Sequence, residues 1–266
     1  MQVKIFTFLE YAKLLGTRDF SREVLKKIKP DINGYAGYKY KEGIKGYLNE
    51  LNDSALKSKG IKFPEIYGLD KKCRLIAQKA VKKVERFVTE KRLFIYVFPQ
   101  INKWVIGNMN GLGGRTVWKN TICLEIFPKK GWEKEFVNTM IHELTHVATG
   151  YYFGGKYSFG ECFVHEGLAE NFREFVLGGK EPWTKAMSET KAMSTFFELK
   201  REIRKKPSMR KYSEIFFGTG KYPNWTGYTI GYYLVKSYLK SKYKNRKIDW
   251  KEVFETKPLE ISKEWL

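Results

Sequence analysis

Apolar residues recur at spacings of three and four in the first third of the chain, a pattern typical of amphipathic helices. Residues 71–91 show it most clearly, and residues 41–59 show it over a similar length. A shorter helix is predicted over 20–29. It is expected to end at Pro30, because proline lacks the backbone N–H that continues a helix. Residues 31–40 are rich in glycine and tyrosine, so a loop is expected there.

The pattern changes near residue 93. Residues 93–98 form a continuous run of aromatic and β-branched residues that stops at a proline, which predicts a buried strand. Residues 121–127 have the same character, and residues 3–8 indicate a short third strand. Residues 110–114 contain three glycines and are expected to form a flexible loop.

Helical periodicity returns after the predicted strands. It spans residues 132–149 and, beyond a glycine-containing loop, residues 160–177. The C-terminal third also favours helices, most clearly over 228–242. The expected fold class is therefore α+β, mainly helical with a small sheet. We expect two parts: a helical N-terminal lobe over 1–92 and a second region over 93–266.

Charge follows the same division. The chain of 266 residues has 50 lysines and arginines against 29 acidic residues, a net charge of +21. Residues 1–92 carry +11 and residues 181–266 carry +9, whereas residues 93–180 carry only +1. The apolar content of 42% excludes a disordered chain. The excess of positive charge favours an acidic or nucleic-acid-associated partner.

Cysteine usage and the N-terminus bear on location. Three cysteines at irregular spacing exclude a disulfide scaffold and a multi-cysteine zinc finger. The apolar run over 5–9 is interrupted by Glu10 and Lys13, which is too short for a signal peptide. We find no run of 18 uncharged apolar residues, so no membrane span is expected. A cytoplasmic protein is predicted.

The three histidines of the chain lie within 24 residues of one another, and two of them frame the sequence His-Glu-Leu-Thr-His over 142–146. On a helix, His142 and His146 share one face and can bind one Zn²⁺. Glu143 lies beside them, where it can act as a general base toward a metal-activated water. The alternative is a pair of histidines packed in the core.

A third zinc ligand is expected at Glu166, 20 residues after His146. The intervening glycine-containing loop allows the second helix to return against the first. Two histidines and one glutamate leave one position open, which is typical of a catalytic site. Glu170 lies one turn after Glu166 and could fix the tautomer of a histidine ligand. The alternative is that both glutamates are ordinary helix carboxylates.

Two further residues lie near the predicted ligand. His165 points about 100° away from Glu166 on a helix, which makes a role in the site less expected. Cys162 lies one turn before Glu166 on the same face. It could line the site or serve as a small buried apolar residue.

The motif and its spacing resemble the gluzincin metallopeptidases, which have the thermolysin-like arrangement. Three pieces together resemble, more specifically, the YjaZ-like family of predicted zinc-dependent proteases: residues 110–114 (Asn-Gly-Leu-Gly-Gly), 166–170 (Glu-Gly-Leu-Ala-Glu) and 225–232 (Trp-Thr-Gly-Tyr-Thr-Ile-Gly-Tyr). The resemblance covers about residues 93–242. It implies a zincin-like core and a peptide or protein substrate.

The resemblance also implies that residues 120–127 are the edge strand that pairs with an extended substrate. Gly113 and Gly114 would let the substrate backbone approach closely. The alternative is a simple sheet edge with a hairpin loop. Tyr228 is the candidate donor to the oxyanion, with Tyr232 as a weaker substitute. Packing of an aromatic ring in the core is the alternative for Tyr228.

The leading hypothesis is a zinc-dependent peptidase with Glu143 as general base. The alternative is a basic nucleic-acid-binding protein with a structural or vestigial metal site, which the charge of +21 favours. Lysines interleaved with glutamates and the lack of a recognisable nucleic-acid motif argue against it.

Overall fold

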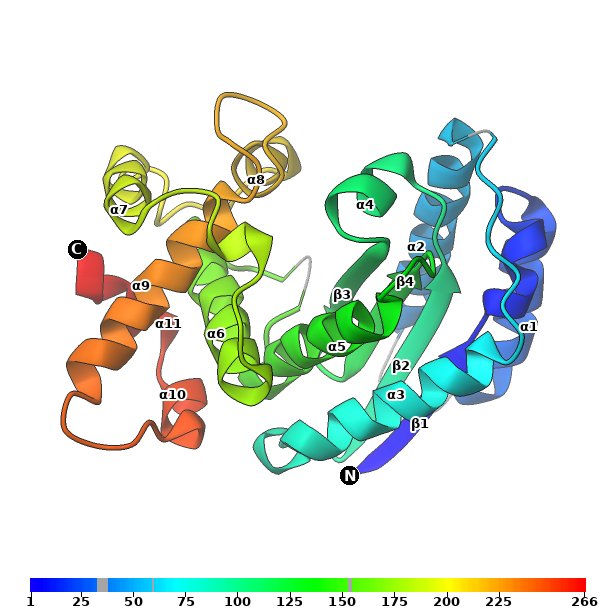
Figure 1. Ribbon diagram of the computed structural model, residues 1–266, viewed down its shortest axis with the longest axis horizontal. Helices are drawn as coiled ribbons and strands as arrows, with labels where there is room; N and C mark the ends of the chain where they lie inside the picture. The colour runs from blue at the N-terminus through cyan, green and yellow to red at the C-terminus, as the bar shows by residue number, and fades with distance from the viewer. Residues whose placement is uncertain (33–37, 59, 153–154) are drawn as a thin grey trace. The chain divides into compact units, whose positions relative to one another are not determined.

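The computed structural model describes residues 1–32, 38–58, 60–152 and 155–266 (Figure 1). The chain forms two compact units. The first comprises Met1–Glu85 and Thr89–Val147, and the second comprises Arg86–Val88 and Ala148–Leu266. The first unit contains a four-stranded sheet, and the described part of the second is built from helices.

The sheet has the strand order β1-β2-β4-β3, with β1 at Gln2–Thr7, β2 at Arg92–Pro99, β4 at Thr121–Ile126 and β3 at Leu112–Trp118. The β1–β2 and β2–β4 pairs are parallel. The β3–β4 pair is antiparallel, as expected for two strands joined by a tight turn.

Helices cover both faces of this sheet within the first unit (Figure 1). Helices α1 (Arg18–Ile32) and α2 (Tyr38–Lys57) pack on one face. Helices α3 (Leu69–Val84) and α5 (Trp132–Thr149) lie over the other. The coverage explains the unbroken apolar run of β2, because a strand buried on both faces cannot alternate polar with apolar residues.

The core between α1, α2 and the sheet is largely aromatic. Phe94, Tyr96 and Phe98 project from alternate positions of β2 toward these helices, and all three are buried. Phe20 of α1 and Leu48 of α2 meet them there. A short helix, α4 (Lys103–Asn108), begins at Asn102, whose side chain accepts two backbone N–H bonds and so caps it.

The predicted helix over 20–29 exists but continues through Pro30 to Ile32. Proline removes only one backbone bond near the end of a helix, so the last turn tolerates it here. Residues 33–37 of the predicted loop lie outside the described residues. The helix predicted over 71–91 is shorter, since α3 ends at Val84 and a 3₁₀ turn follows over Glu85–Phe87.

The expectation that residues 120–127 form the edge strand is wrong. This segment is β4, which lies between β2 and β3. The edges are β1 and β3, and β3 begins within the glycine-rich segment expected to be a loop. Strand β1 pairs with β2, so residues 2–7 and 92–97 belong to one sheet.

In the second unit, α6 (Phe159–Leu177) packs along α9 (Thr226–Lys242). Four shorter helices accompany them: α7 (Glu189–Glu198), α8 (Met209–Phe216), α10 (Trp250–Glu255) and α11 (Pro258–Ser262). The start of α6 is fixed by a capping box in which Ser158 and Glu161 bond to each other's backbone N–H. No helix in the described residues is long and apolar enough to cross a membrane.

Candidate metal centre

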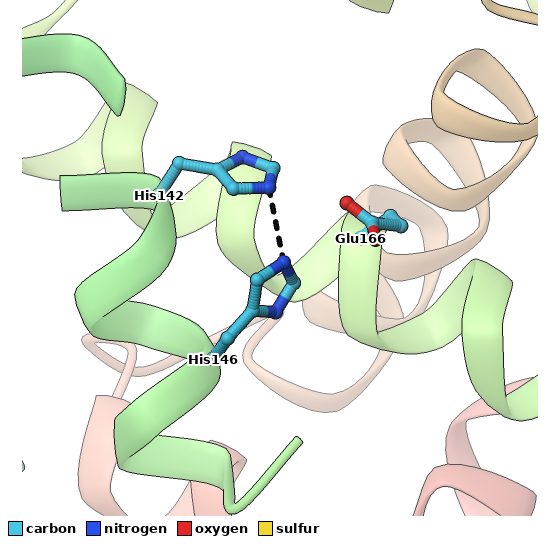
Figure 2. A group of neighbouring side chains, drawn as sticks. All are labelled: His142, His146 and Glu166. Atoms are coloured by element: carbon cyan, nitrogen blue, oxygen red, sulfur yellow. Dashed lines mark hydrogen bonds between the residues drawn. The ribbon is translucent and has the colours of Figure 1, made fainter. Parts of the chain in front are cut away.

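The residues of the His-Glu-Leu-Thr-His sequence lie on α5, as predicted. His142 and His146 project from the same face, and their Nε2 atoms are 3.0 Å apart (Figure 2). Two nitrogens bound to one tetrahedral zinc ion, each at ~2.1 Å, are separated by about 3.4 Å. The two imidazoles are therefore close to the separation that a shared zinc ion requires.

Glu166 of α6 completes the group. One ligand atom from each of His142, His146 and Glu166 lies within 4.8 Å of the others. Figure 2 shows the three side chains directed toward a common point. Glu166 and His146 are buried, and His142 is partly exposed. Two imidazole nitrogens and one carboxylate fit Zn²⁺ and leave one coordination position open.

Glu143 is positioned by the edge strand β3 within the first unit. The hydroxyl of Thr116 lies 2.8 Å from Glu143 Oε2 and 3.1 Å from its backbone oxygen, so Thr116 donates to this glutamate. Both residues are buried. The bond from Thr116 lowers the basicity of Oε2, so Oε1 is the more basic of the two carboxylate oxygens.

Gly114 of β3 explains how the strand and helix come so close. A Cβ at this position would lie 2.5 Å from Thr139 Cγ2, 2.7 Å from Glu143 Oε1 and 2.9 Å from Glu143 Cγ. These distances are far below van der Waals contact. Glycine at 114 is therefore required by the side chains of Thr139 and Glu143 on α5. The predicted approach of a substrate backbone at Gly113 and Gly114 stays a prediction.

A second close approach holds the helix that carries Glu166. A Cβ on Gly167 would lie 2.1 Å from the Gly231 backbone oxygen, and one on Gly231 would lie 2.1 Å from the Phe163 oxygen. Asn171 donates its amide to the Gly167 oxygen and also to the Tyr232 oxygen on α9, at 2.8 and 3.0 Å. The glycines of residues 166–170 and 225–232 therefore meet at one helix crossing.

Tyr212 of α8 was not predicted to take part in the site. Its hydroxyl lies 3.5 Å from Glu166 Oε1, the long end of the hydrogen-bond range. Burial, together with the nearby Tyr151 and Glu166, raises the pKa of Tyr212 well above its usual value. The phenol is therefore a neutral donor directed at the carboxylate.

Tyr228 lies at the start of α9, and its ring packs against Phe216 and Trp225 at centroid distances of 5.4 and 5.7 Å. These contacts account for the aromatic ring at this position. Its role as an oxyanion donor stays a prediction. Tyr232 donates its hydroxyl to Glu174 on α6 at 2.5 Å.

The other candidates have structural partners. His165 stacks on Tyr151 with ring centroids 4.5 Å apart. The carboxylate of Glu170 is 3.1 Å from Arg173 Nε, and both side chains are fully buried. Burial raises the pKa of the Cys162 thiol to about 12, so it is a neutral thiol at physiological pH.

Neither Thr116 nor Tyr212 has a signal in the sequence. Thr116 lies on β3, a strand that the apolar pattern does not predict, and no spacing relates Tyr212 to the histidines. Both are found only when the chain is folded.

One family model, described as Predicted Zn-dependent protease (DUF2268), matches residues 73–263. The matched range contains both histidines, Glu143 and Glu166, and it covers more than two thirds of the chain. No curated protein and no solved structure matches the chain.

Proposed function

Because the chain belongs to a family of predicted Zn-dependent proteases, we propose that it hydrolyses peptide bonds at a site of the gluzincin type. One observation supports this most directly: the two histidine nitrogens and a glutamate oxygen converge to within 4.8 Å. In this proposal His142, His146 and Glu166 hold one Zn²⁺.

When bound, zinc supplies a Lewis acid that polarises the scissile carbonyl and lowers the pKa of an attacking water. Glu143 accepts the proton of that water at Oε1 and then delivers it to the leaving amine. Thr116 keeps the carboxylate in place by its bond to Oε2. Its hydroxyl therefore has a positioning role in the reaction.

Two tyrosines take different parts in this proposal. Tyr212 orients Glu166 through the contact of 3.5 Å. Tyr228 is the proposed donor to the oxyanion that forms as the carbonyl carbon becomes tetrahedral.

The substrate would be an extended polypeptide that pairs with β3. This strand is the last in the sheet order and pairs only with β4 among the described strands. An edge strand offers backbone N–H and C=O groups to a further strand. The proposed substrate-binding edge therefore moves from the predicted residues 120–127 to Leu112–Trp118.

The proposal is tested by zinc content and peptide cleavage together. The purified wild-type protein is expected to contain about one zinc ion per chain and to cleave an unfolded protein substrate. Glu143→Gln should retain zinc and lose turnover by several orders of magnitude. His146→Ala should lose both zinc and turnover.

Two results would contradict the proposal. One is a wild-type protein that binds no divalent metal ion. The other is a Glu143→Gln variant that cleaves as fast as the wild type, because a different group would then move the proton.

A further inference from the structure

A hollow of about 800 Å³ lies on the second unit, between the later turns of α6, the end of α9 and the segment leading to α10. Five cationic side chains and one carboxylate line it: Lys236, Lys240, Lys244, Arg246, Lys247 and Glu174. The hollow thus carries an excess of about four positive charges near neutral pH.

The carboxylates nearby neutralise only part of this excess. Glu174 accepts a hydrogen bond from Tyr232 and lies 4.0 Å from Lys236. Glu252 pairs with Arg246 at 3.1 Å. Within the part of the chain that the structure describes, Lys240, Lys244 and Lys247 have no carboxylate within 4.0 Å, and all three are exposed.

The pKa of Lys236 depends on its burial and on charged neighbours, one of which, Lys180, does not line the hollow. Partial burial lowers the pKa of Lys236, and the nearby charge of Lys180 lowers it further, although Glu174 acts in the opposite direction. The negative end of the α9 dipole favours Lys240, which lies in the last turn, but its effect does not extend to the rest of the cluster. Lys244 and Lys247 lie beyond the helix, which ends at Lys242.

The floor of the hollow is apolar. Phe175 of α6 is 48% exposed, a large fraction for an aromatic side chain. Its ring is packed against Phe172 and Trp250 at centroid distances of 6.0 and 5.5 Å, so it is held in place. Leu239 and Ile248 complete the floor.

We propose that this hollow binds an acidic polypeptide segment that carries one large apolar side chain among its carboxylates. The exposed lysines would pair with the carboxylates, and Phe175 would contact the apolar side chain. The proposal does not depend on peptidase activity, because it requires only binding to the second unit.

An acidic peptide fits better than a nucleic acid. Proteins that bind single strands usually stack several successive bases on several exposed rings. Here Phe175 is exposed, whereas the rings of Trp250 and Tyr243 are buried. One accessible ring beside a compact group of lysines fits a single apolar side chain flanked by acidic residues.

The test is a binding titration in which fluorescence anisotropy measures the bound fraction of the probe. The probe is a labelled peptide with three glutamates on each side of one phenylalanine. The double variant Lys240→Glu/Lys244→Glu should weaken binding at least about tenfold, because two attractive charges become repulsive. The variant Lys240→Arg/Lys244→Arg should bind as the wild type does.

A matched control separates this site from general attraction to a basic protein. Lys200→Glu/Lys206→Glu makes the same change in net charge at exposed lysines elsewhere in the second unit. It should leave the affinity within about twofold of the wild type, since neither lysine lines the hollow and salt screens the interaction between separated exposed charges.

The apolar contact is tested by a double-mutant cycle. Replacing the phenylalanine of the peptide with serine should weaken binding to the wild type but not to Phe175→Ala. Thermal unfolding of each variant identifies any that fails to fold, and the lysine variants change only exposed side chains.

Three outcomes would overturn the proposal. The first is no binding of the peptide by the wild type, and the second is an equal loss of affinity in the control variant. The third is tighter binding of a single-stranded oligonucleotide of the same charge, weakened by the same two lysine changes. That result would assign the hollow to nucleic acid.

Discussion

The carboxylate of Glu143 is fixed by a buried hydroxyl that belongs to no motif. Replacing Thr116 with valine keeps the shape but removes the bond of 2.8 Å to Oε2. We expect turnover to fall about tenfold or more, because a hydrogen bond to a charged group contributes roughly 1.5–3 kcal/mol. Zinc content should be unchanged. Steady-state kinetics with metal analysis measures both.

Thr195→Val is the matched control, since Thr195 is also buried and donates its hydroxyl to the Lys191 backbone oxygen at 2.8 Å. It should lower the stability of the fold and leave the turnover of the folded protein at the wild-type value. If Thr116→Val retains full turnover, Thr116 does not position the base.

Tyr212 gives a second prediction for a single residue. Tyr212→Phe removes the hydroxyl next to Glu166 and keeps the buried ring. We expect zinc affinity to fall about tenfold, the lower end of the effect of groups that orient metal ligands. Competition with a chelator of known affinity measures this.

Tyr238→Phe provides the comparison, because the hydroxyl of Tyr238 accepts a bond from Lys242 on α9. Its zinc affinity should equal that of the wild type. Equal affinities in all three proteins would show that Tyr212 does not act on the metal site.

For individual residues, the sequence predicts which side chains a single helix places on the same face. His142 and His146 are four residues apart, so helix geometry alone places them on one face. Glu166 required the further assumption that the next helix returns. Thr116 and Tyr212 reach their partners through contacts between elements, which spacing along the chain does not encode.

Strand β3 lies at an edge of the sheet and contacts α5 through Thr116 and Gly114. Its two neighbouring glycines allow a direct comparison. Gly114→Ala places a Cβ 2.5 Å from Thr139 Cγ2 and 2.7 Å from Glu143 Oε1, so both side chains must move. We expect loss of most turnover with zinc retained. Gly113→Ala should be tolerated, because its Cβ would meet Glu125 at an ordinary distance of 3.7 Å.

Both variants replace a glycine with an alanine at adjacent positions of β3. Any general effect on strand propensity is therefore the same in both and cancels when the two are compared. Turnover and zinc content are measured on the same samples. If the two variants lose activity equally, the contact with Glu143 is not what requires glycine at 114.

Elements with strong periodicity are recognised from the sequence, whereas β3 is not. Residues 132–149 match α5, and 93–98 lie inside β2, since each has a regular apolar pattern. Strand β3 (Leu112–Trp118) contains two adjacent glycines, which have low strand propensity. It forms because it pairs with β4 and because its glycine at 114 lets the strand approach α5 closely. Both causes are tertiary contacts, which the local sequence pattern does not show.

Across the whole chain, charge and candidate chemistry are separated in sequence. Residues 93–180 carry a net charge of +1 and contain His142, His146 and Glu166, whereas the flanking segments carry +11 and +9. The nucleic-acid-binding alternative therefore concerns residues other than the proposed metal ligands. Salt-dependent retention on a random duplex tests it independently of zinc.

Zinc should stabilise the folded protein, so its removal should lower Tm. A ligand that binds only the folded protein stabilises it by about 2.7 kcal/mol at a hundred times its Kd. For a chain of this size, adding zinc to the metal-free protein should raise Tm by roughly 5–10 °C. Glu143→Gln should retain this shift, and His146→Ala should lose it.

The histidine variant also distinguishes the proposed site from the cysteines. Cys73, Cys123 and Cys162 are free and buried. Burial raises the pKa of Cys73 to about 12, so its thiol is protonated and a poor zinc ligand in the folded protein. A zinc-dependent rise in Tm that persists in His146→Ala would place the bound ion at another site, and calorimetry of both proteins decides between them.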